Sequence, residues 1–470
     1  MNSTLAGYDG FNICLGSDSY KFSHPDQYPS NVEHVYSYLE ARGGSYPGVI
    51  PFGQQGNLMR YFVGQVVTNE KIEEARDIIG SHFGNTTLFN AAEEMWKHIV
   101  DKHGGMLPLE IKSVPEGTLV PVRNVLMTAV NTCPEHKCRA LTNFCETKLM
   151  HVWHPMTVAT RSYYLKKIIL KYLEETGDPS LIDFKLHDFG YRGVSSEESA
   201  AMGGAGHLVN SKGTDNMAAI LFCRKYYGEP MAGFSIPASE HSTMTAWGEA
   251  NEADACRNML DTYPDGLVAC VSDQYDIYKL CRNVWGKTLR DKILNRKGTL
   301  VVRPDSGDPL EVLPPVFEIL GNAFGTEINN KGYQVLNPHI RVIQGDGINE
   351  TTLPEILEKL KSLKWSADNI AFGSGGGLLQ QMDRDTCKMA FKCSAVYRNG
   401  IWQDVYKNPV TDSGKTSKRG RLVLRKEGHL FFTEKWTPER AKEDYMRTVF
   451  LNGEMVVTDT LAQIRARAWG

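Results

Sequence analysis

Polar residues follow short apolar segments at several places in the middle of the chain, where they could carry chemistry. Arg303 and Asp305 lie two residues apart in RPDSGDP, so a cationic donor and a carboxylate can point into one pocket. Asp346 lies between two glycines in QGDG, which lets its backbone approach a ligand and its carboxylate accept sugar hydroxyls. An arginine can hold a carbonyl or a phosphate, whereas an internal salt bridge is the structural alternative for Arg303 and Asp305.

A glycine-rich segment, Gly373-Ser-Gly-Gly-Gly377, follows the apolar residues Ile370-Ala-Phe and precedes the helical pattern LLQQM. Bare backbone N–H groups at a strand-to-helix junction can surround a phosphate, helped by the helix N-terminus. The alternative is a simple glycine-rich turn. Because three glycines coincide with the junction, we favour phosphate binding.

Other strand ends carry a histidine, an aspartate, an aromatic ring and a cation. His241 in ASEHST could act as a base, bind an anion or accept a phosphoryl group, although a lone histidine is more often structural. Asp273 in VSDQYD could supply a carboxylate or only cap a helix. Phe189 and Arg192 in HDFGYRG offer a stacking face and a positive charge. HExxH, GxSxG and CxxC patterns are absent from the sequence, so we expect neither a zinc site nor covalent acyl chemistry.

These segments end short apolar runs that alternate with helical patterns, which predicts parallel βα units. The segments are HDFGYRG (187–193), SIPASEHS (235–242), CVSDQYD (270–276), VVRPDSGDP (301–309), VIQGDG (342–347) and AFGSGGG (371–377). Polar residues directly after each strand are typical of a βα-barrel whose active site lies at the carboxyl ends of the strands. An open doubly wound sheet is the competing fold.

The two ends of the chain are predicted to form a second domain. Residues 1–150 mix β-like runs with amphipathic helices, including one that begins near Lys71. The region beyond about 390 is predicted to be rich in strands, with a hairpin around a Lys-Glu-Gly turn. We therefore expect an α/β barrel over residues 151–387, and a mixed domain from 1–150 completed by the β-rich segment 388–470.

The composition is that of an ordinary globular protein, with 41 % hydrophobic, 10 % aromatic and 23 % charged residues among 470. The 52 Lys+Arg and 55 Asp+Glu give a net charge of -3, which argues against a general nucleic-acid or membrane-surface binder. The sequence has no signal-peptide pattern and no run of eighteen apolar residues. Its ten cysteines fit reduced thiols, so we expect a cytoplasmic protein.

Taken together, these motifs resemble the nicotinamide phosphoribosyltransferase family of dimeric type II phosphoribosyltransferases. HDFGYRG, KGTD (212–215), ASEHST, RPDSGDP, QGDG and FGSGGGLLQ occur in this order, and the resemblance runs from SDSYK (17–21) to the C-terminal region. It implies an incomplete βα-barrel with a second mixed, β-rich domain built from both chain ends. It also implies a homodimer with shared active sites that transfers the phosphoribosyl group of phosphoribosyl pyrophosphate to nicotinamide in NAD salvage, releasing pyrophosphate.

The resemblance assigns residues to the flat base. Phe189 and, across the dimer, Tyr20 would sandwich the nicotinamide ring, and Ser235 would belong to the same site. Arg303 would donate to the carboxamide oxygen, while Asp215 would accept from its NH₂ group. Because a carboxylate repels a carboxylate, Asp215 would select nicotinamide over nicotinate.

The resemblance also assigns residues to the phosphosugar site. It places Asp305 and Asp346 near the ribose and Gly345, Gly375 and Gly376 at the 5′-phosphate. The cations implied around pyrophosphate, several of them from across the dimer interface, are Arg42, Arg192, Arg384, Lys392 and Lys407. Mg²⁺, held mainly through pyrophosphate, would help to stabilise the leaving group. The attacking pyridine nitrogen has a lone pair and needs no general base.

The catalytic set implied by the resemblance is His241, Asp273, Arg303 and Asp305. In the family, ATP phosphorylates the histidine that matches His241, so ATP is an expected co-substrate. One departure is Ala390, which replaces a serine two positions before the pyrophosphate-binding lysine. The alternatives are a nicotinate phosphoribosyltransferase, an isomerase or lyase barrel that would need a proton-shuttling base or Schiff-base lysine, and a non-catalytic binding protein.

Overall fold

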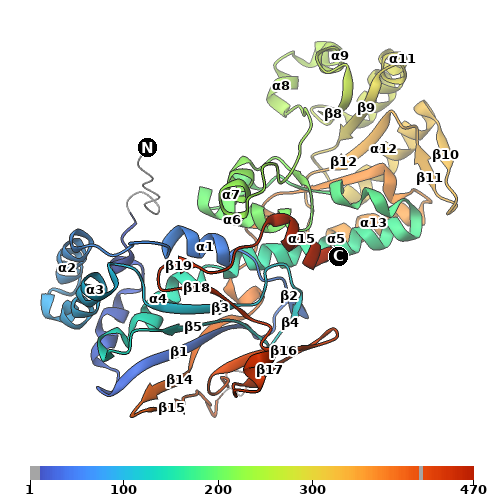
Figure 1. Ribbon diagram of the computed structural model, residues 1–470. Helices are drawn as coiled ribbons and strands as arrows, with labels where there is room; N and C mark the ends of the chain where they lie inside the picture. The colour runs from blue at the N-terminus through green and yellow to red at the C-terminus, as the bar shows by residue number, and fades with distance from the viewer. Residues whose placement is uncertain (1–10, 412–415) are drawn as a thin grey trace. The chain divides into compact units, whose positions relative to one another are not determined.

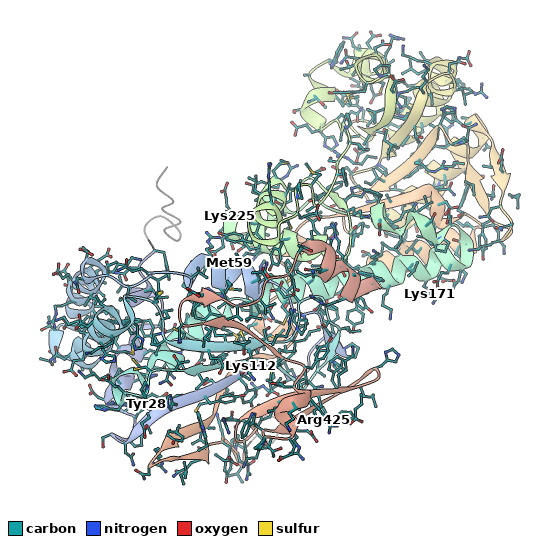
Figure 2. The ribbon with its side chains drawn as sticks, in the orientation of Figure 1. Tyr28, Met59, Lys112, Lys171, Lys225 and Arg425 are labelled. Carbon is teal, nitrogen blue, oxygen red and sulfur yellow. The ribbon has the colours of Figure 1, made fainter. Side chains whose placement is uncertain are left out.

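The computed structural model describes residues 11–411 and 416–470, which divide into two compact units (Figure 1). Unit 1 contains both chain ends, up to Thr160 and from Met382, together with Lys225–Glu229. Unit 2 contains Arg161–Arg224 and Pro230–Gln381. Side chains occupy the space between the helices and strands within each unit (Figure 2).

Unit 2 is built on a six-stranded parallel sheet in the order β7-β6-β13-β12-β9-β8. The strands are β6 Leu186–Asp188, β7 Gly213–Thr214, β8 Asp265–Val271, β9 Lys297–Arg303, β12 Ile340–Gln344 and β13 Ile370–Ser374. Segment 234–238 links the two outer strands, because Phe234 bridges to Gly213 and Ala238 bridges to Ala269. The predicted incomplete barrel is therefore confirmed, with an irregular segment between β7 and β8.

The barrel strands bury side chains on both faces. Ala269 pairs with Val301 and Ile343 with Ala371, and Ala269, Val301 and Ile343 form a buried cluster. The helices outside the strands include α9 Glu252–Thr262, α11 Arg290–Leu294, α12 Pro309–Phe324 and α13 Thr352–Ser362 (Figure 1). Two buried faces explain why the strands read as continuous apolar runs in the sequence.

Unit 1 contains a seven-stranded antiparallel sheet in the order β15-β14-β1-β5-β3-β18-β19. The strands are β1 Val32–Ala41, β3 Leu109–Ser113, β5 Val125–Asn131, β14 Met389–Arg398, β15 Ile401–Asp404, β18 Arg447–Leu451 and β19 Glu454–Met455. The long pair β1 and β14 joins segments from opposite ends of the chain, with Tyr38 opposite Lys392. The predicted construction of this unit from both chain ends is confirmed.

Local predictions in unit 1 are also confirmed. Helix α2 (Asn69–Phe83) begins after Thr68, whose side chain accepts a hydrogen bond from the Lys71 N–H, and ends at Gly84 in the left-handed conformation. Strands β16 (Leu422–Glu427) and β17 (Leu430–Lys435) form the predicted hairpin. Further helices of unit 1 are α3 Asn90–His103, α4 Leu141–Met150 and α15 Leu461–Trp469.

Within residues 11–411 and 416–470, no helix combines the length and the apolar character needed to cross a bilayer. The N-terminal pattern, for which we expected no signal peptide, includes residues 1–10, which lie outside the described residues. All ten cysteines are described, and each is a free thiol.

Candidate active site

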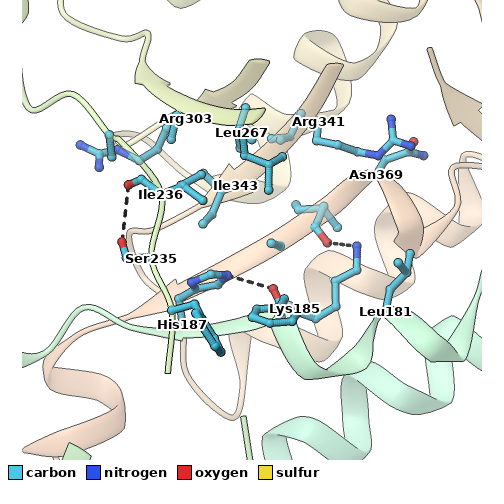
Figure 3. Close-up of a pocket in the computed structure, with 18 of the residues that line it drawn as sticks. Leu181, Lys185, His187, Ser235, Ile236, Leu267, Arg303, Arg341, Ile343 and Asn369 are labelled. Atoms are coloured by element: carbon cyan, nitrogen blue, oxygen red, sulfur yellow. Dashed lines mark hydrogen bonds between the residues drawn. The ribbon is translucent and has the colours of Figure 1, made fainter. Parts of the chain in front are cut away.

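A cavity of about 520 Å³ lies in the barrel of unit 2 (Figure 3). Its walls are largely aliphatic and include Ile236, Leu267, Ala269, Val301 and Ile343. Four residues assigned to the base also line it, namely Phe189, Asp215, Ser235 and Arg303. The fold therefore brings four separate segments of the chain to one pocket that suits a flat, mostly apolar ligand.

Gly373 allows the Phe189 ring to lie against the barrel wall, and Gly345 lies in ordinary contact distance of the same ring. A Cβ atom on Gly373 would come within 2.0 Å of Phe189 Cε2, and one on Gly345 would come within 3.5 Å of the same atom. The Phe189 N–H donates to the Ser374 carbonyl at 3.0 Å, which fixes the backbone after β6. Gly373 therefore has a packing role that its position in a glycine-rich loop did not reveal.

Asp215 is held at the pocket by its neighbours. The Ser235 hydroxyl donates to Asp215 Oδ1, and the Asp215 N–H donates to the Asp188 carbonyl at 3.0 Å. Asp188 is fully buried, and burial raises the pKa of its carboxyl to about 6 even though Gly190 and Asn216 donate hydrogen bonds to it. This buried anchor fixes the loop that presents Asp215.

Arg303 ends β9 and exposes 17 % of its side chain. Its Nη2 lies 3.7 Å from Asp305 Oδ2, beyond hydrogen-bond distance, and its buried Nε has no hydrogen-bond partner among the described residues. The internal ion pair between Arg303 and Asp305, which was the structural alternative for these residues, is therefore present only in part. The pair is loose enough to leave the guanidinium with donors for a ligand.

His241 lies between two carboxylates. Its Nε2 is 2.9 Å from Asp273 Oδ1, and its Nδ1 is 4.0 Å from Asp305 Oδ2. Burial alone would raise the pKa of Asp273, but hydrogen bonds from Ser306, His241 and the Asp305 N–H outweigh burial and lower it. The histidine remains 47 % exposed, so the network orients a ring that solutes can reach.

The two glycine loops follow neighbouring strands, β12 and β13. A Cβ on Gly377 would come within 2.8 Å of the Ile348 carbonyl, and one on Gly193 within 3.3 Å of Gly376 N. The loops after β6, β12 and β13 are therefore closely packed, with Asp346 exposed beside them. The prediction of a helix after the glycines is wrong in its length, because the observed helix α14 spans only Gly376–Leu379. A full helix N-terminus is thus not part of this site.

Four of the cations assigned to pyrophosphate gather in unit 1. Burial lowers the pKa of Lys392 on β14, and the charges of Arg42, Arg384 and Lys407 lower it further, whereas Glu146 opposes them. Because each of these charges acts on Lys392, the other three side chains lie around it. Such a positive cluster is suited to a polyanion.

The remaining assigned residues are divided between the units. Tyr20, in unit 1, exposes 61 % of its surface and contacts His24 edge to face at 4.8 Å between ring centroids. Arg192, in unit 2, is exposed in the short turn Tyr191–Gly193. Ala390 is buried opposite Glu40 in the sheet of unit 1.

Sequence reasoning missed the residues at the opposite end of the cavity. Lys185, which precedes β6, and Arg341, near the start of β12, line the same cavity. Burial lowers the pKa of Lys185 to about 7, but its Nζ donates to the carbonyls of Ala367, Asp368 and Ile370 at 2.9–3.1 Å. A lysine with this set of acceptors holds strands together and is not free to form a Schiff base.

Comparison with known proteins identifies the family of the chain. Residues 184–454 match the nicotinate phosphoribosyltransferase (NAPRTase) family, and residues 12–111 match the N-terminal domain of nicotinamide phosphoribosyltransferase. The chain belongs to the NAPRTase family. A nicotinamide phosphoribosyltransferase from Xanthomonas campestris is 48 % identical over 97 % of this chain and 98 % of its own length. One from Acinetobacter baylyi is 32 % identical over 96 % and 95 %, respectively.

Two solved members of the same fold are more distant. The nicotinate-nucleotide pyrophosphorylase of Pyrococcus furiosus has a TM-score of 0.58 and 15 % identity, covering 100 % of this chain and 97 % of its own. Human nicotinic acid phosphoribosyltransferase has the same score and identity, covering 96 % and 92 %. At this identity the likeness establishes the NAPRTase-like fold alone.

Proposed function

We propose that this NAPRTase-family chain is an enzyme that transfers the 5-phosphoribosyl group of phosphoribosyl pyrophosphate to nicotinamide. The products are nicotinamide mononucleotide and pyrophosphate, which places the reaction in NAD salvage. The 48 % identity to a nicotinamide phosphoribosyltransferase over nearly the whole chain supports this choice. The observation that carries it is the arrangement of Asp215 and Arg303 around one apolar cavity with Phe189.

This arrangement suits a neutral carboxamide on an aromatic ring. Phe189 offers a stacking face, Arg303 offers N–H donors to an amide oxygen, and Asp215 offers an acceptor to an NH₂ group. Nicotinate would put a second carboxylate beside Asp215, at a cost in electrostatic repulsion. The alternative, nicotinate as the substrate, is favoured by the names of the matching family and of the two solved structures, but the charge of Asp215 argues against it.

The phosphoribosyl group is proposed to lie across the loops after β9, β12 and β13. A Cβ on Gly345 would lie 3.4 Å from Asp305 Oδ1, so Asp305 borders the loop that carries Asp346. These carboxylates can accept ribose hydroxyls, while Gly375 and Gly376 allow backbone N–H groups to approach the 5′-phosphate.

In the proposed reaction the pyridine nitrogen of nicotinamide attacks C1 of the ribose. The new C–N bond forms as the C–O bond to pyrophosphate breaks, and pyrophosphate leaves with the electron pair. The residues act by positioning the two substrates and by stabilising charge in the transition state. Carboxylate oxygens of Asp305 and Asp346 are suitable ligands for Mg²⁺, which when bound would neutralise part of the pyrophosphate charge.

The pyrophosphate is proposed to contact Arg192 together with Arg42, Arg384, Lys392 and Lys407, several of these cations being supplied by a second copy of the chain. We further propose a homodimer in which a second copy of the chain contributes Tyr20 to each site. The high exposure of the Tyr20 ring supports this, because a large aromatic surface left in water is available to a partner or ligand. We propose a cytoplasmic location on the basis of the ten free thiols.

ATP is proposed to phosphorylate His241. The exposed ring is reachable by a nucleotide, and the hydrogen bond to Asp273 fixes its orientation. In that step a nitrogen–phosphorus bond forms, the bond between the γ-phosphorus and its bridging oxygen breaks, and ADP leaves. The neighbouring carboxylate of Asp305 connects this histidine to the proposed ribose site.

A steady-state assay of both bases, with and without ATP, tests the proposal. We expect pyrophosphate release to require nicotinamide, to be faster with nicotinamide than with nicotinate, and to be stimulated by ATP. Faster turnover of nicotinate would overturn the choice of base. Full activity in Arg303→Ala or Asp305→Ala would exclude the cavity as the active site.

A further inference from the structure

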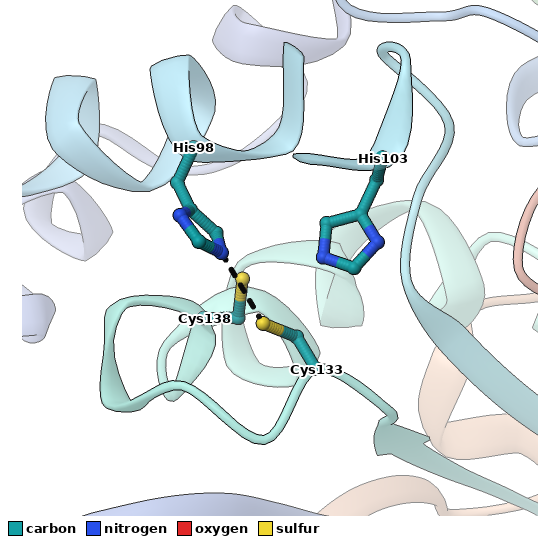
Figure 4. Close-up of side chains that lie close together, drawn as sticks. All are labelled: His98, His103, Cys133 and Cys138. Carbon is teal, nitrogen blue, oxygen red and sulfur yellow. Dashed lines mark hydrogen bonds between the residues drawn. The ribbon is translucent and has the colours of Figure 1, made fainter. Parts of the chain in front are cut away.

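Two histidines and two cysteines converge in unit 1 (Figure 4). His98 and His103 come from the last turns of α3, whereas Cys133 and Cys138 come from the connection between β5 and α4. One potential ligand atom from each residue lies within 4.8 Å of all the others. Neither the barrel cavity nor the proposed reaction uses these side chains.

The distances are close to those of a tetrahedral metal site. With bonds of about 2.3 Å to sulfur and about 2.0–2.1 Å to nitrogen, the ligand atoms of a tetrahedral zinc ion lie about 3.4–3.8 Å apart. The observed distance from Cys133 Sγ to His98 Nε2 is 3.4 Å. Figure 4 shows a ring nitrogen of each histidine pointing toward the two sulfurs. Side-chain shifts of about 1 Å would bring all four ligand atoms to these spacings.

The surroundings also fit a metal-binding histidine. His98 Nδ1, on the side of the ring away from Cys133, lies 3.6 Å from a carboxylate oxygen of Glu135. A carboxylate behind a histidine favours the tautomer that offers Nε2 to a metal. His103 Nε2 is buried and has no hydrogen-bond partner among the described residues. A buried nitrogen without a hydrogen-bond partner destabilises the fold, and a bound cation would supply the missing partner.

Zinc binds cysteine as the thiolate, so the charge of the complete site decides whether it can be buried. Two thiolates and a divalent cation sum to no net charge. The complete set is therefore compatible with a buried position, which a lone cation or thiolate is not.

We propose that His98, His103, Cys133 and Cys138 bind one zinc ion in a closed, four-ligand structural site. Two soft sulfurs with two imidazoles select zinc among the common divalent cations, and four protein ligands leave no position for a substrate. The ion would tie the end of α3 to the connection after β5, and its binding would release the thiol protons. The sequence expectation of no zinc site, which rested on missing CxxC spacing, is revised by this proposal.

The four side chains do not follow a common zinc-binding spacing. Each pair is separated by four intervening residues, as His98-x₄-His103 and Cys133-x₄-Cys138, and about thirty residues lie between the pairs. A pair of cysteines this close could instead form a disulfide. Reduced thiols and the two facing imidazoles favour the metal, and the experiment distinguishes the two outcomes.

The test uses the 470-residue chain without a histidine tag, exposed to Zn²⁺ under reducing conditions and then dialysed. We expect about one zinc per chain by mass spectrometry. Titration with Co²⁺ should give the visible absorption of tetrahedral cobalt bound to thiolates. Cys133→Ser and His103→Gln should each lose both signals, whereas the matched controls Cys145→Ser and His82→Gln should keep them.

His103→Gln is the variant expected to keep its fold, because His103 is only partly buried. Its phosphoribosyl transfer activity and its circular dichroism spectrum check that the chain is folded. A strong chelator should lower the Tm of the parent chain but not that of His103→Gln. Failure of the parent chain to retain Zn²⁺, equal zinc content in parent and His103→Gln, or a Cys133–Cys138 disulfide in place of metal would each overturn the proposal.

Discussion

Replacing Asp215 by Asn tests how this chain distinguishes its base. Asparagine keeps an oxygen that can accept the hydrogen bond from Ser235, so the loop should retain its conformation. The change removes one negative charge from the wall of the cavity and leaves its size nearly unaltered. The ratio of kcat/KM for nicotinamide to that for nicotinate should therefore report the charge alone.

The size of the effect follows from the geometry. Two carboxylates about 4 Å apart repel by about 4 kcal/mol at an effective dielectric constant of about 20. Asp215 is exposed, so solvent screening reduces the usable part to about 1.4–2.8 kcal/mol. Because 1.4 kcal/mol corresponds to a factor of ten, the ratio should fall by about 10- to 100-fold.

The assay measures initial rates of mononucleotide formation with each base at saturating phosphoribosyl pyrophosphate. Asp346→Asn is the matched control, since it makes the same substitution at the proposed ribose site. That control should lower kcat/KM for both bases by a similar factor and leave their ratio unchanged. An unaltered ratio in Asp215→Asn would refute the role of the carboxylate, and so would an equal change of ratio in the control.

Four further predictions follow from the geometry. Gly373→Ala should lower kcat/KM for nicotinamide by about 100-fold, because a methyl group there overlaps the Phe189 ring; near-normal kinetics would contradict this placement. Coexpressed Tyr20→Ala and Asp305→Ala chains should recover about a quarter of the parent activity, since heterodimers restore one of two shared sites; no recovery would argue that each site belongs to a single chain. Lys392→Ala should raise the KM for phosphoribosyl pyrophosphate by about 10-fold or more with a smaller effect on that for nicotinamide, and equal effects on both would count against the anion role. The pKa of Asp273 is lowered in the folded chain, so its stabilising contribution is present above about pH 4 and is lost as pH falls through the folded value; Tm profiles of Asp273→Asn should therefore fall less steeply in acid than those of the parent, and parallel profiles would disprove it.

The positions of the barrel strands and their terminal loops could be predicted from the sequence. Phe189, Ser235 and Arg303 come from strand-end segments of the predicted pattern and line one cavity, whereas Asp215 in the same cavity was assigned by the family resemblance alone. Such a prediction needs only local information. In parallel strands the residues that follow each carboxyl end share one edge of the sheet, whatever the detailed packing.

Other features depended on contacts between distant segments. Lys392 and Arg42 approach each other because β14 pairs with β1, and the sequence has no short-range sign of that pairing. The sequence also has no local sign of the close fit between Gly373 and Phe189, or of Lys185 at the far end of the cavity.

By itself, the sequence determined which chemical groups this chain can present and at which strand ends they occur, because βα units are defined by the period and order of nearby residues. Tertiary structure alone decided which groups meet across long separations, namely the four cations of unit 1 and the His98, His103, Cys133 and Cys138 cluster. Contacts between such distant residues are fixed by the packing of whole sheets and helices. That packing depends on the sum of many weak contacts and leaves no local pattern in the sequence.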